Sequence, residues 1–237
     1  RSDRDWSSDV CSSDLNNYII ADIFIDNNYV NKDTRIINSY EQRKREGDLK
    51  KNKFSLDYEN EQELKDYCSI TIDDVPIEFS YFYKFNKVGN HKIKYLFMNK
   101  IEKTNDLFDN CYFIKKLDFS NFNTEEVKNM CSMFFRCKNL EDINLSIFNT
   151  EKVINMSYMF FGCEFLKYID FSNFNTGNVV DMNSFLSGCK SLTKIDLSNL
   201  DIKNVIDLSW MFYGCSSLIY INLFNFNTEN VIYMETM

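Results

Sequence analysis

The positions of apolar residues repeat with a constant period in the second half of the chain. Five cysteines are spaced 26 residues apart, namely Cys111, Cys137, Cys163, Cys189 and Cys215. The same apolar types return at the same offsets after each cysteine; after Cys137 they are Leu140, Ile143, Leu145, Phe148, Val153, Met156, Met159 and Phe160. Self-similarity with a period of about 20–50 residues is typical of solenoid proteins, in which one structural unit per repeat stacks on its neighbours.

Each repeat contains two different apolar periodicities. Ile143 and Leu145 are two residues apart, which indicates a strand with one face turned inward. From Val153 onward the apolar positions follow at spacings of three, three, one and three residues, which is typical of one face of a helix. The sequence therefore predicts one strand and one short helix per repeat. Over residues 101–237 this gives a right-handed α/β solenoid, with a parallel sheet on one side and short helices on the other.

Polar residues and glycines at the ends of the helical stretch support this division. A threonine precedes the stretch as a candidate N-cap, at Thr124, Thr150, Thr176 and Thr228. Glycine stands just before the cysteine in three repeats, where a left-handed residue would end a helix. These glycines are Gly162, Gly188 and Gly214, while Asn110 holds the same place in the first unit and Arg136 is the exception.

The repeat pattern also defines the limits of the solenoid. Ile101, Thr104, Leu107, Phe108 and Cys111 match the helical half, so we expect the preceding domain to enter the solenoid through a half repeat. At the other end, the sequence stops just before the Phe and Cys that would complete the fifth repeat, which predicts a truncated fifth repeat. One repeat alone buries too little apolar surface to offset its conformational entropy, so the array requires caps.

Residues 16–100 predict a small α+β domain with a mainly antiparallel sheet, which we interpret as the N-terminal cap. Segments 18–26 and 34–39 are β-rich and predict a hairpin across a turn at Asn27 and Asn28. Two charged segments, 40–49 and 61–67, favour exposed helices, and 69–72, 75–85 and 92–98 favour strands. Pro76 near a strand start is typical of a sheet edge. Cys68 and His91 have no partners in sequence, so we interpret them as a partly buried thiol and a turn-flanking imidazole.

The first 15 residues, RSDRDWSSDVCSSDL, have no apolar period of 2 or 3.6. They resemble the translation of a sequencing-library adapter joined to a reading frame, so we interpret residues 1–15 as an unstructured artefact and exclude them from fold reasoning. The authentic N-terminus is then missing from this sequence.

Charge and hydropathy narrow the possible partners. The formal net charge is −8, which disfavours nucleic-acid binding because an acidic surface repels phosphate backbones. The sequence contains no apolar run approaching the ~18 residues that cross a bilayer, so it predicts no membrane-spanning segment.

A resemblance follows from three stretches, LDFSNFNTEEVKNMCSMFFRC, INLSIFNTEKVINMSYMFFGC and IDFSNFNTGNVVDMNSFLSGC. Over residues 101–237 the chain resembles the BspA-type leucine-rich repeat, the array known from mycoplasma lipoproteins and many protist proteins. The resemblance implies a leucine-rich-repeat solenoid, commonly at cell surfaces and in adhesion or host contact. It favours a cell-surface location, with the cytoplasm as the alternative.

Candidate chemistry is sparse. The cysteines predict buried free thiols, because side chains stacked in neighbouring repeats run parallel and five equivalent residues cannot all pair. No Cys-x-x-Cys occurs and His91 is the only histidine, so we expect no zinc site and no cofactor. The repeats lack a histidine base and a phosphate-binding loop, so we predict that the fragment is not an enzyme.

Two rows of polar side chains follow the strands. The row Asp118, Asn144, Asp170, Asp196 and Asn222 predicts solvated side chains, with a shared calcium ion as the alternative. The row Asn123, Asn149, Asn175, Asp201 and Asn227 predicts side chains that satisfy backbone groups in turns.

The outward positions of the strands predict a protein-binding face, because they vary between repeats while the inward positions do not. Its candidate residues are Lys116, Asp118, Asp142, Asn144, Tyr168, Asp170, Lys194, Asp196, Tyr220 and Asn222. We expect a non-catalytic interaction module, an adhesive or ligand-binding segment of a larger surface protein with a protein partner. The alternatives are an intracellular scaffold and the binding arm of an enzyme whose catalytic domain is missing. A plain solvated sheet face is the other interpretation of the same positions.

Overall fold

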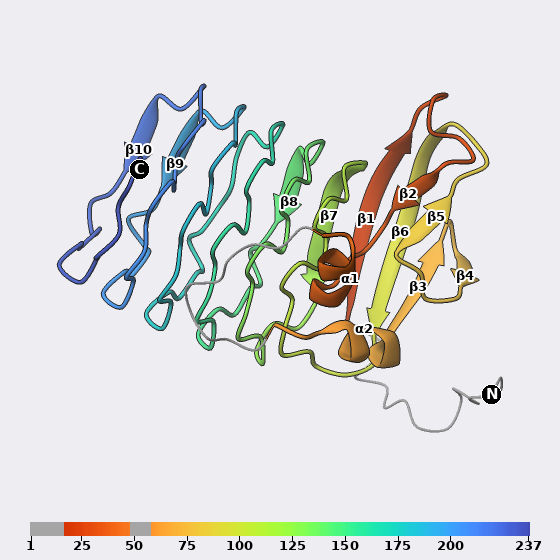
Figure 1. Cartoon of the computed structure of the whole chain (residues 1–237), viewed down its shortest axis with the longest axis horizontal. Helices are drawn as coiled ribbons and strands as arrows, with labels where there is room; N and C mark the ends of the chain where they lie inside the picture. The colour runs from red at the N-terminus through yellow and green to blue at the C-terminus, as the bar shows by residue number, and fades with distance from the viewer. Residues whose placement is uncertain (1–16, 48–57) are drawn as a thin grey trace.

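The computed structural model describes residues 17–47 and 58–237. The interpretation of residues 1–15 as an artefact lies outside the described residues. The molecule is elongated, with an N-terminal sheet at one end and a row of similar coils leading to the C-terminus at the other (Figure 1). Helices are confined to the N-terminal third of the described chain, as α1 (Tyr40–Arg45) and α2 (Glu61–Tyr67).

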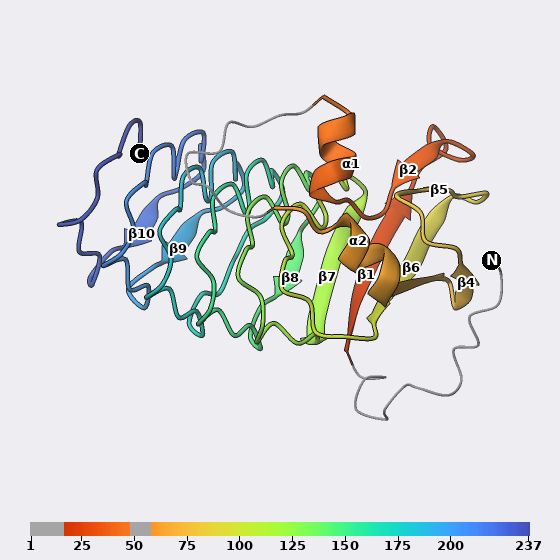
Figure 2. The same cartoon turned by 60° about the horizontal axis from the view of Figure 1, so that its bottom comes forward.

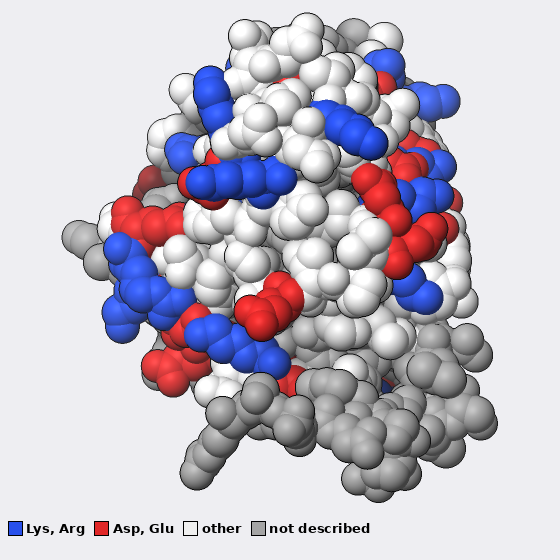
Figure 3. Space-filling view, turned by 90° about the vertical axis from the view of Figure 1, so that its right-hand side faces the viewer, with Lys and Arg blue, Asp and Glu red and all other residues white. Residues whose placement is uncertain are grey.

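The N-terminal region forms a mainly antiparallel sheet that continues into the repeats. Its strands are β1 (Tyr18–Ile25), β3 (Cys68–Ile72), β4 (Val75–Ile77) and β6 (Gly89–Phe97), joined by β7 (Ile114–Asn121) and β8 (Asp142–Asn144) of the repeats. The strand order is β4-β3-β6-β1-β7-β8. Pro76 lies in β4 at the edge of this sheet, as predicted, where its missing N–H leaves no ladder bond unmade. Basic and acidic side chains are both scattered over this end of the molecule, among uncharged residues (Figure 3).

The predicted hairpin between segments 18–26 and 34–39 is wrong. Strand β1 pairs with β6 and β7 on its two sides, whereas β2 (Asp33–Arg35) pairs with β5 (Phe82–Lys84) in a separate two-stranded sheet. The physical reason is that β1 gains a ladder on both edges in this position, a continuous one with β6 and an irregular one with β7, which satisfy more of its backbone groups than a hairpin partner on one edge. Its inward residues, Ile19, Ala21, Ile23 and Ile25, are all buried.

The contact between β1 and β7 joins the N-terminal region to the repeats. The two strands are antiparallel, whereas β7 and β8 run parallel with Leu117 opposite Ile143. A second parallel pair, β9 (Lys194–Asp196) and β10 (Tyr220–Asn222), places Ile195 opposite Ile221. Both parallel pairs match residues 26 apart, so equivalent positions of successive units lie side by side. The N-terminal strands thus cover the edge that the first repeat strand would otherwise expose.

The predicted helices of the repeats are absent from residues 101–237, where turns occupy their place. Two residues per unit, four positions apart, have a positive φ, such as Ser132 (57°) and Arg136 (55°). A left-handed residue every fourth position interrupts a helix. Backbone amides therefore alternate between two kinds of bond: Met133 N donates to Met130 O of its own turn (3.2 Å), and Phe134 N donates to Met159 O of the next unit (2.9 Å). Turns of this kind reproduce the spacing of a helical stripe without forming a helix.

The threonines also act between units rather than as helix N-caps. Thr150 Oγ1 donates to the backbone oxygen of Asn175 (2.9 Å) and accepts from the backbone nitrogen of the same residue (2.8 Å). Thr124 makes the same two contacts with Asn149. Each hydroxyl thereby satisfies two backbone groups of the following unit, and it is buried where it does so.

The core runs the length of the array. Phenylalanines of consecutive units stack, with ring centroids 6.2 Å apart between Phe108 and Phe134 and 5.2 Å apart between Phe134 and Phe160. The half-repeat residues expected to belong to this core, Ile101, Thr104, Leu107, Phe108 and Cys111, are all buried. Helices α1 and α2 lie on one side of β1 and β7, against the first coils (Figure 2).

Candidate protein-binding surface

Strands β7, β8, β9 and β10 hold eight of the ten candidate residues, while Tyr168 and Asp170 lie in the intervening unit, where no strand forms. Inward residues such as Ile143 and Ile195 are buried, whereas their neighbours on either side are exposed. Lys116 is opposite Asp142 in the register, and its Nζ lies 2.9 Å from Asp142 Oδ2. The alternation of the sequence therefore predicted which side chains lie on this face. The ion pair follows from the register between units.

Two tyrosines are the most prominent apolar groups among the candidate residues. Tyr168 is 58% exposed and Tyr220 is 57% exposed. Tyr220 lies opposite Lys194 in the β9–β10 pair, so an aromatic ring and a cation are neighbours on this face. A Tyr side chain combines a large apolar ring with a polar tip, which suits a protein contact.

The row of Asp and Asn beside the tyrosines has a structural role as well as an exposed position. Asp118 Oδ1 accepts from the backbone N–H of Ser120 (2.9 Å), and Asp196 Oδ1 accepts from that of Ser198 (2.9 Å). The hydroxyl and amide of the partner serine lower the pKa of each of these two aspartates. The same amide contact is made by Asn144, Asp170 and Asn222. Within the described residues, no group of three or more His, Cys, Asp or Glu could hold a metal ion.

The second polar row satisfies backbone groups in turns, as predicted. The Oδ1 atom of Asn123, Asn149, Asn175, Asp201 and Asn227 accepts in each case from the backbone N–H two residues later. This contact is the usual Asx-turn geometry, and it fixes the bend after each strand.

The cysteine ladder lies inside the array as free thiols. Each thiol from Cys137 onward donates to a backbone oxygen 29 residues earlier; the distances are 3.1 Å for Cys137, 3.2 Å for Cys163, 3.3 Å for Cys189 and 3.1 Å for Cys215. Burial raises the pKa of these thiols, so they stay protonated at neutral pH. The thiol is thus a small apolar group that also satisfies a carbonyl of the preceding unit.

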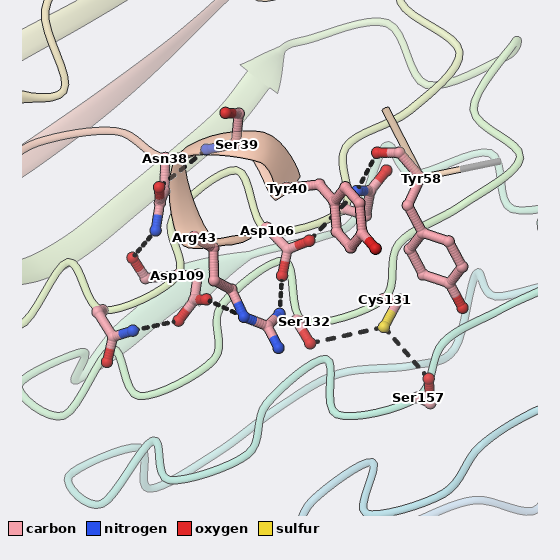
Figure 4. A network of polar contacts seen from close by, with 12 residues as sticks. Asn38, Ser39, Tyr40, Arg43, Tyr58, Asp106, Asp109, Cys131, Ser132 and Ser157 are labelled. Atoms are coloured by element: carbon pink, nitrogen blue, oxygen red, sulfur yellow. Dashed lines mark hydrogen bonds and ion pairs between the residues drawn. The ribbon is translucent and has the colours of Figure 1, made fainter. Parts of the chain in front are cut away.

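A buried polar network, which the sequence pattern did not indicate, holds α1 against the first unit (Figure 4). Arg43, 4% exposed, makes an ion pair with Asp106 and a second, at 3.2 Å, with Asp109 Oδ2. Deeper along the same side, Asn155 Nδ2 donates to the hydroxyl of Tyr58 (2.9 Å). Asp106 and Asp109 stand where the next unit has Ser132 and Phe135. This departure from the repeat pattern is the feature of the sequence that could have indicated the network.

No helix among the described residues is long and apolar enough to cross a membrane. A family model matches the chain twice, over residues 77–170 and 144–237, and is described as "Mycoplasma protein of unknown function, DUF285". The chain belongs to the DUF285 family. The two DUF285 matches overlap and together extend over residues 77–237, so the family region contains the candidate surface and begins within β4. No curated protein and no solved structure matches the chain significantly.

Proposed function

We propose that the DUF285 units of this chain are BspA-type leucine-rich repeats stacked as a solenoid. The 26-residue interval and the parallel register between equivalent positions support this assignment. A further parallel ladder on the turn side has one β-bridge between each pair of neighbouring units, in the order Lys103, Asn129, Asn155, Asp181, Asp207 and Tyr233. Neighbours that contact each other at every repeat position are the defining property of a solenoid.

We propose further that this array is a non-catalytic protein-interaction module, an adhesive or ligand-binding segment of a larger surface protein. The observation that carries the proposal is the pair Tyr168 and Tyr220, both more than half exposed at equivalent outward positions of their units. Tyr220 begins strand β10, whereas Tyr168 lies in a unit that has no strand. Aromatic residues at the centre of an interface commonly contribute most of its binding energy, while charged residues at its rim set orientation. Here the surrounding charges are the rows of Lys and Asp.

The test compares two sets of variants of the full chain. Tyr168→Ala with Tyr220→Ala removes both rings from the strand face. Tyr213→Ala is the matched control, because Tyr213 is 54% exposed but packs edge-on against Trp210 on the turn side of its unit. Each immobilised protein is exposed to solubilised cell-surface proteins, and proteins enriched by the unmodified chain are then measured individually for affinity.

We expect the double variant to weaken such an affinity about tenfold or more, which corresponds to at least ~1.4 kcal/mol, and the Tyr213 variant to leave it unchanged. Circular dichroism should show the same folded signal for all three proteins, because the substituted rings lie outside the core. An affinity that survives the double substitution would remove the strand face from consideration.

A further inference from the structure

A cavity of about 600 Å³ lies at the outer edge of the N-terminal sheet, beside the end of α2 (Figure 1). Its walls come from the last turn of α2, from β3 and β4, and from Met98 after β6. This volume falls in the usual range for small-molecule sites. None of the lining residues belongs to the candidate protein-binding face, so the cavity is a separate site.

The cavity is present because β4 leaves the sheet before β3 ends. Strand β3 pairs with β6 from Cys68 to Ile72, but it pairs with β4 only from Ile70 to Ile72. Phe97 lies opposite Cys68 and donates its backbone N–H to Asn17 O, on the side of β1 (2.8 Å). The carbonyl of Cys68 therefore points away from β6, toward the edge that β4 has left. It accepts no hydrogen bond from any residue that the structure describes.

Apolar side chains form most of the cavity wall. Ile70 is buried, and Ile77 and Phe79 are half-buried against the same core. Met98 is fixed at its backbone, where its N–H donates to Tyr67 O (2.9 Å). An apolar wall with a few polar groups is typical of sites that bind small molecules.

The charged groups of the cavity are two acids and one base, and the base is already paired. Lys65 Nζ lies 2.7 Å from Glu61 Oε1. Glu78 is exposed and makes no hydrogen bond or ion pair within the described chain. Asp66 is half-buried, and of its two oxygens only Oδ2 has a described donor, Gln62 Nε2 (2.9 Å). The accessible and unmatched capacity of the cavity is therefore acceptor capacity.

We propose that this cavity binds a small molecule that carries a primary ammonium group on a flat apolar body. The ammonium has three N–H donors, which meet the carboxylates of Glu78 and Asp66 and the carbonyl of Cys68. The apolar body lies against Ile77 and Phe79. An anionic group in the same place would face two carboxylates without an available base, so the cavity selects a cation.

The test uses three probes that share one apolar body and differ in their polar group: the cation 2-phenylethylamine, the neutral 2-phenylethanol and the anion 3-phenylpropionate. Each is titrated into the full chain, labelled with ¹³C at the methyl groups of Met and Ile, while the signals of Met98 and Ile77 are followed. We expect saturable shifts of both signals with the amine, at an affinity at least tenfold above that for either other probe.

Glu78→Gln keeps the size of the side chain and removes its charge. We expect this variant to unfold at the same urea midpoint, because Glu78 is exposed and unbonded, and to bind the amine at least fivefold more weakly. Glu151→Gln removes the same charge at an exposed position outside the cavity and should leave the affinity unchanged. Equal binding of the amine and the alcohol, an absence of saturable shifts with the amine, or full affinity in Glu78→Gln would each overturn the proposal.

Discussion

The hydroxyl of Thr150 allows a sharp test of how neighbouring units are held together. Thr150→Val keeps the shape of the side chain and removes the hydroxyl, which makes two bonds with the backbone of Asn175, at 2.9 and 2.8 Å. Thr150 is 1% exposed, so water does not replace the lost hydroxyl. The backbone N–H and C=O of Asn175 therefore each lose a hydrogen-bond partner in the variant. At about 0.5–1.5 kcal/mol for each bond, the expected loss of unfolding free energy is about 1–3 kcal/mol.

Thr228→Val is the matched control. Thr228 occupies the same place in the last unit, but it is exposed and its hydroxyl has no hydrogen bond within the described chain. The structure predicts a change of less than about 0.5 kcal/mol there. A helix N-cap at both positions would instead cost about 1 kcal/mol in each variant.

The assay is equilibrium urea unfolding of both variants and the unmodified chain, followed by far-UV circular dichroism and by fluorescence. Equal losses at Thr150 and Thr228, or no loss at Thr150, would refute the assignment of the threonine to contacts between units. A loss confined to Thr150 would support it.

Three further outcomes follow from the packing of the array. Gly188→Ala should lower the unfolding free energy more than Gly47→Ala, as measured by urea unfolding. Both glycines have a positive φ, which costs an alanine about 1–2 kcal/mol at either position. Only at Gly188 would the new Cβ also lie 3.2 Å from the backbone of the preceding unit. Arg43→Met should cost about 3–5 kcal/mol, since two buried carboxylates lose their cation; a change below 1 kcal/mol would contradict this. Iodoacetamide at pH 8 should label Cys215 before Cys163, because Cys215 is only partly buried; mass spectrometry of native protein that finds Cys163 labelled first would exclude the packing described.

The sequence alone determined which residues face the core and where the chain turns. A period of 26 residues fixes the positions of the cysteines and of the apolar side chains, and these positions are buried in the units that have a neighbour on both sides. In the last unit Ile221 and Leu223 occupy the same positions and are each 37% exposed. It also located the positions that take a left-handed conformation just before the cysteines, since glycine and asparagine tolerate it. The outward positions, and with them the exposure of Tyr168 and Tyr220, follow from the period of two, although no strand forms around Tyr168.

Only the tertiary structure decided how those positions are connected. A spacing of three and four residues is shared by a helix and by successive turns with left-handed corners, and the choice depends on amides that bond to the next unit rather than to their own. The sequence also left undetermined which strands pair with β1, because a strand with one buried face can pair on either edge. The charges that hold α1 come together from segments far apart in sequence, where no periodic pattern links them.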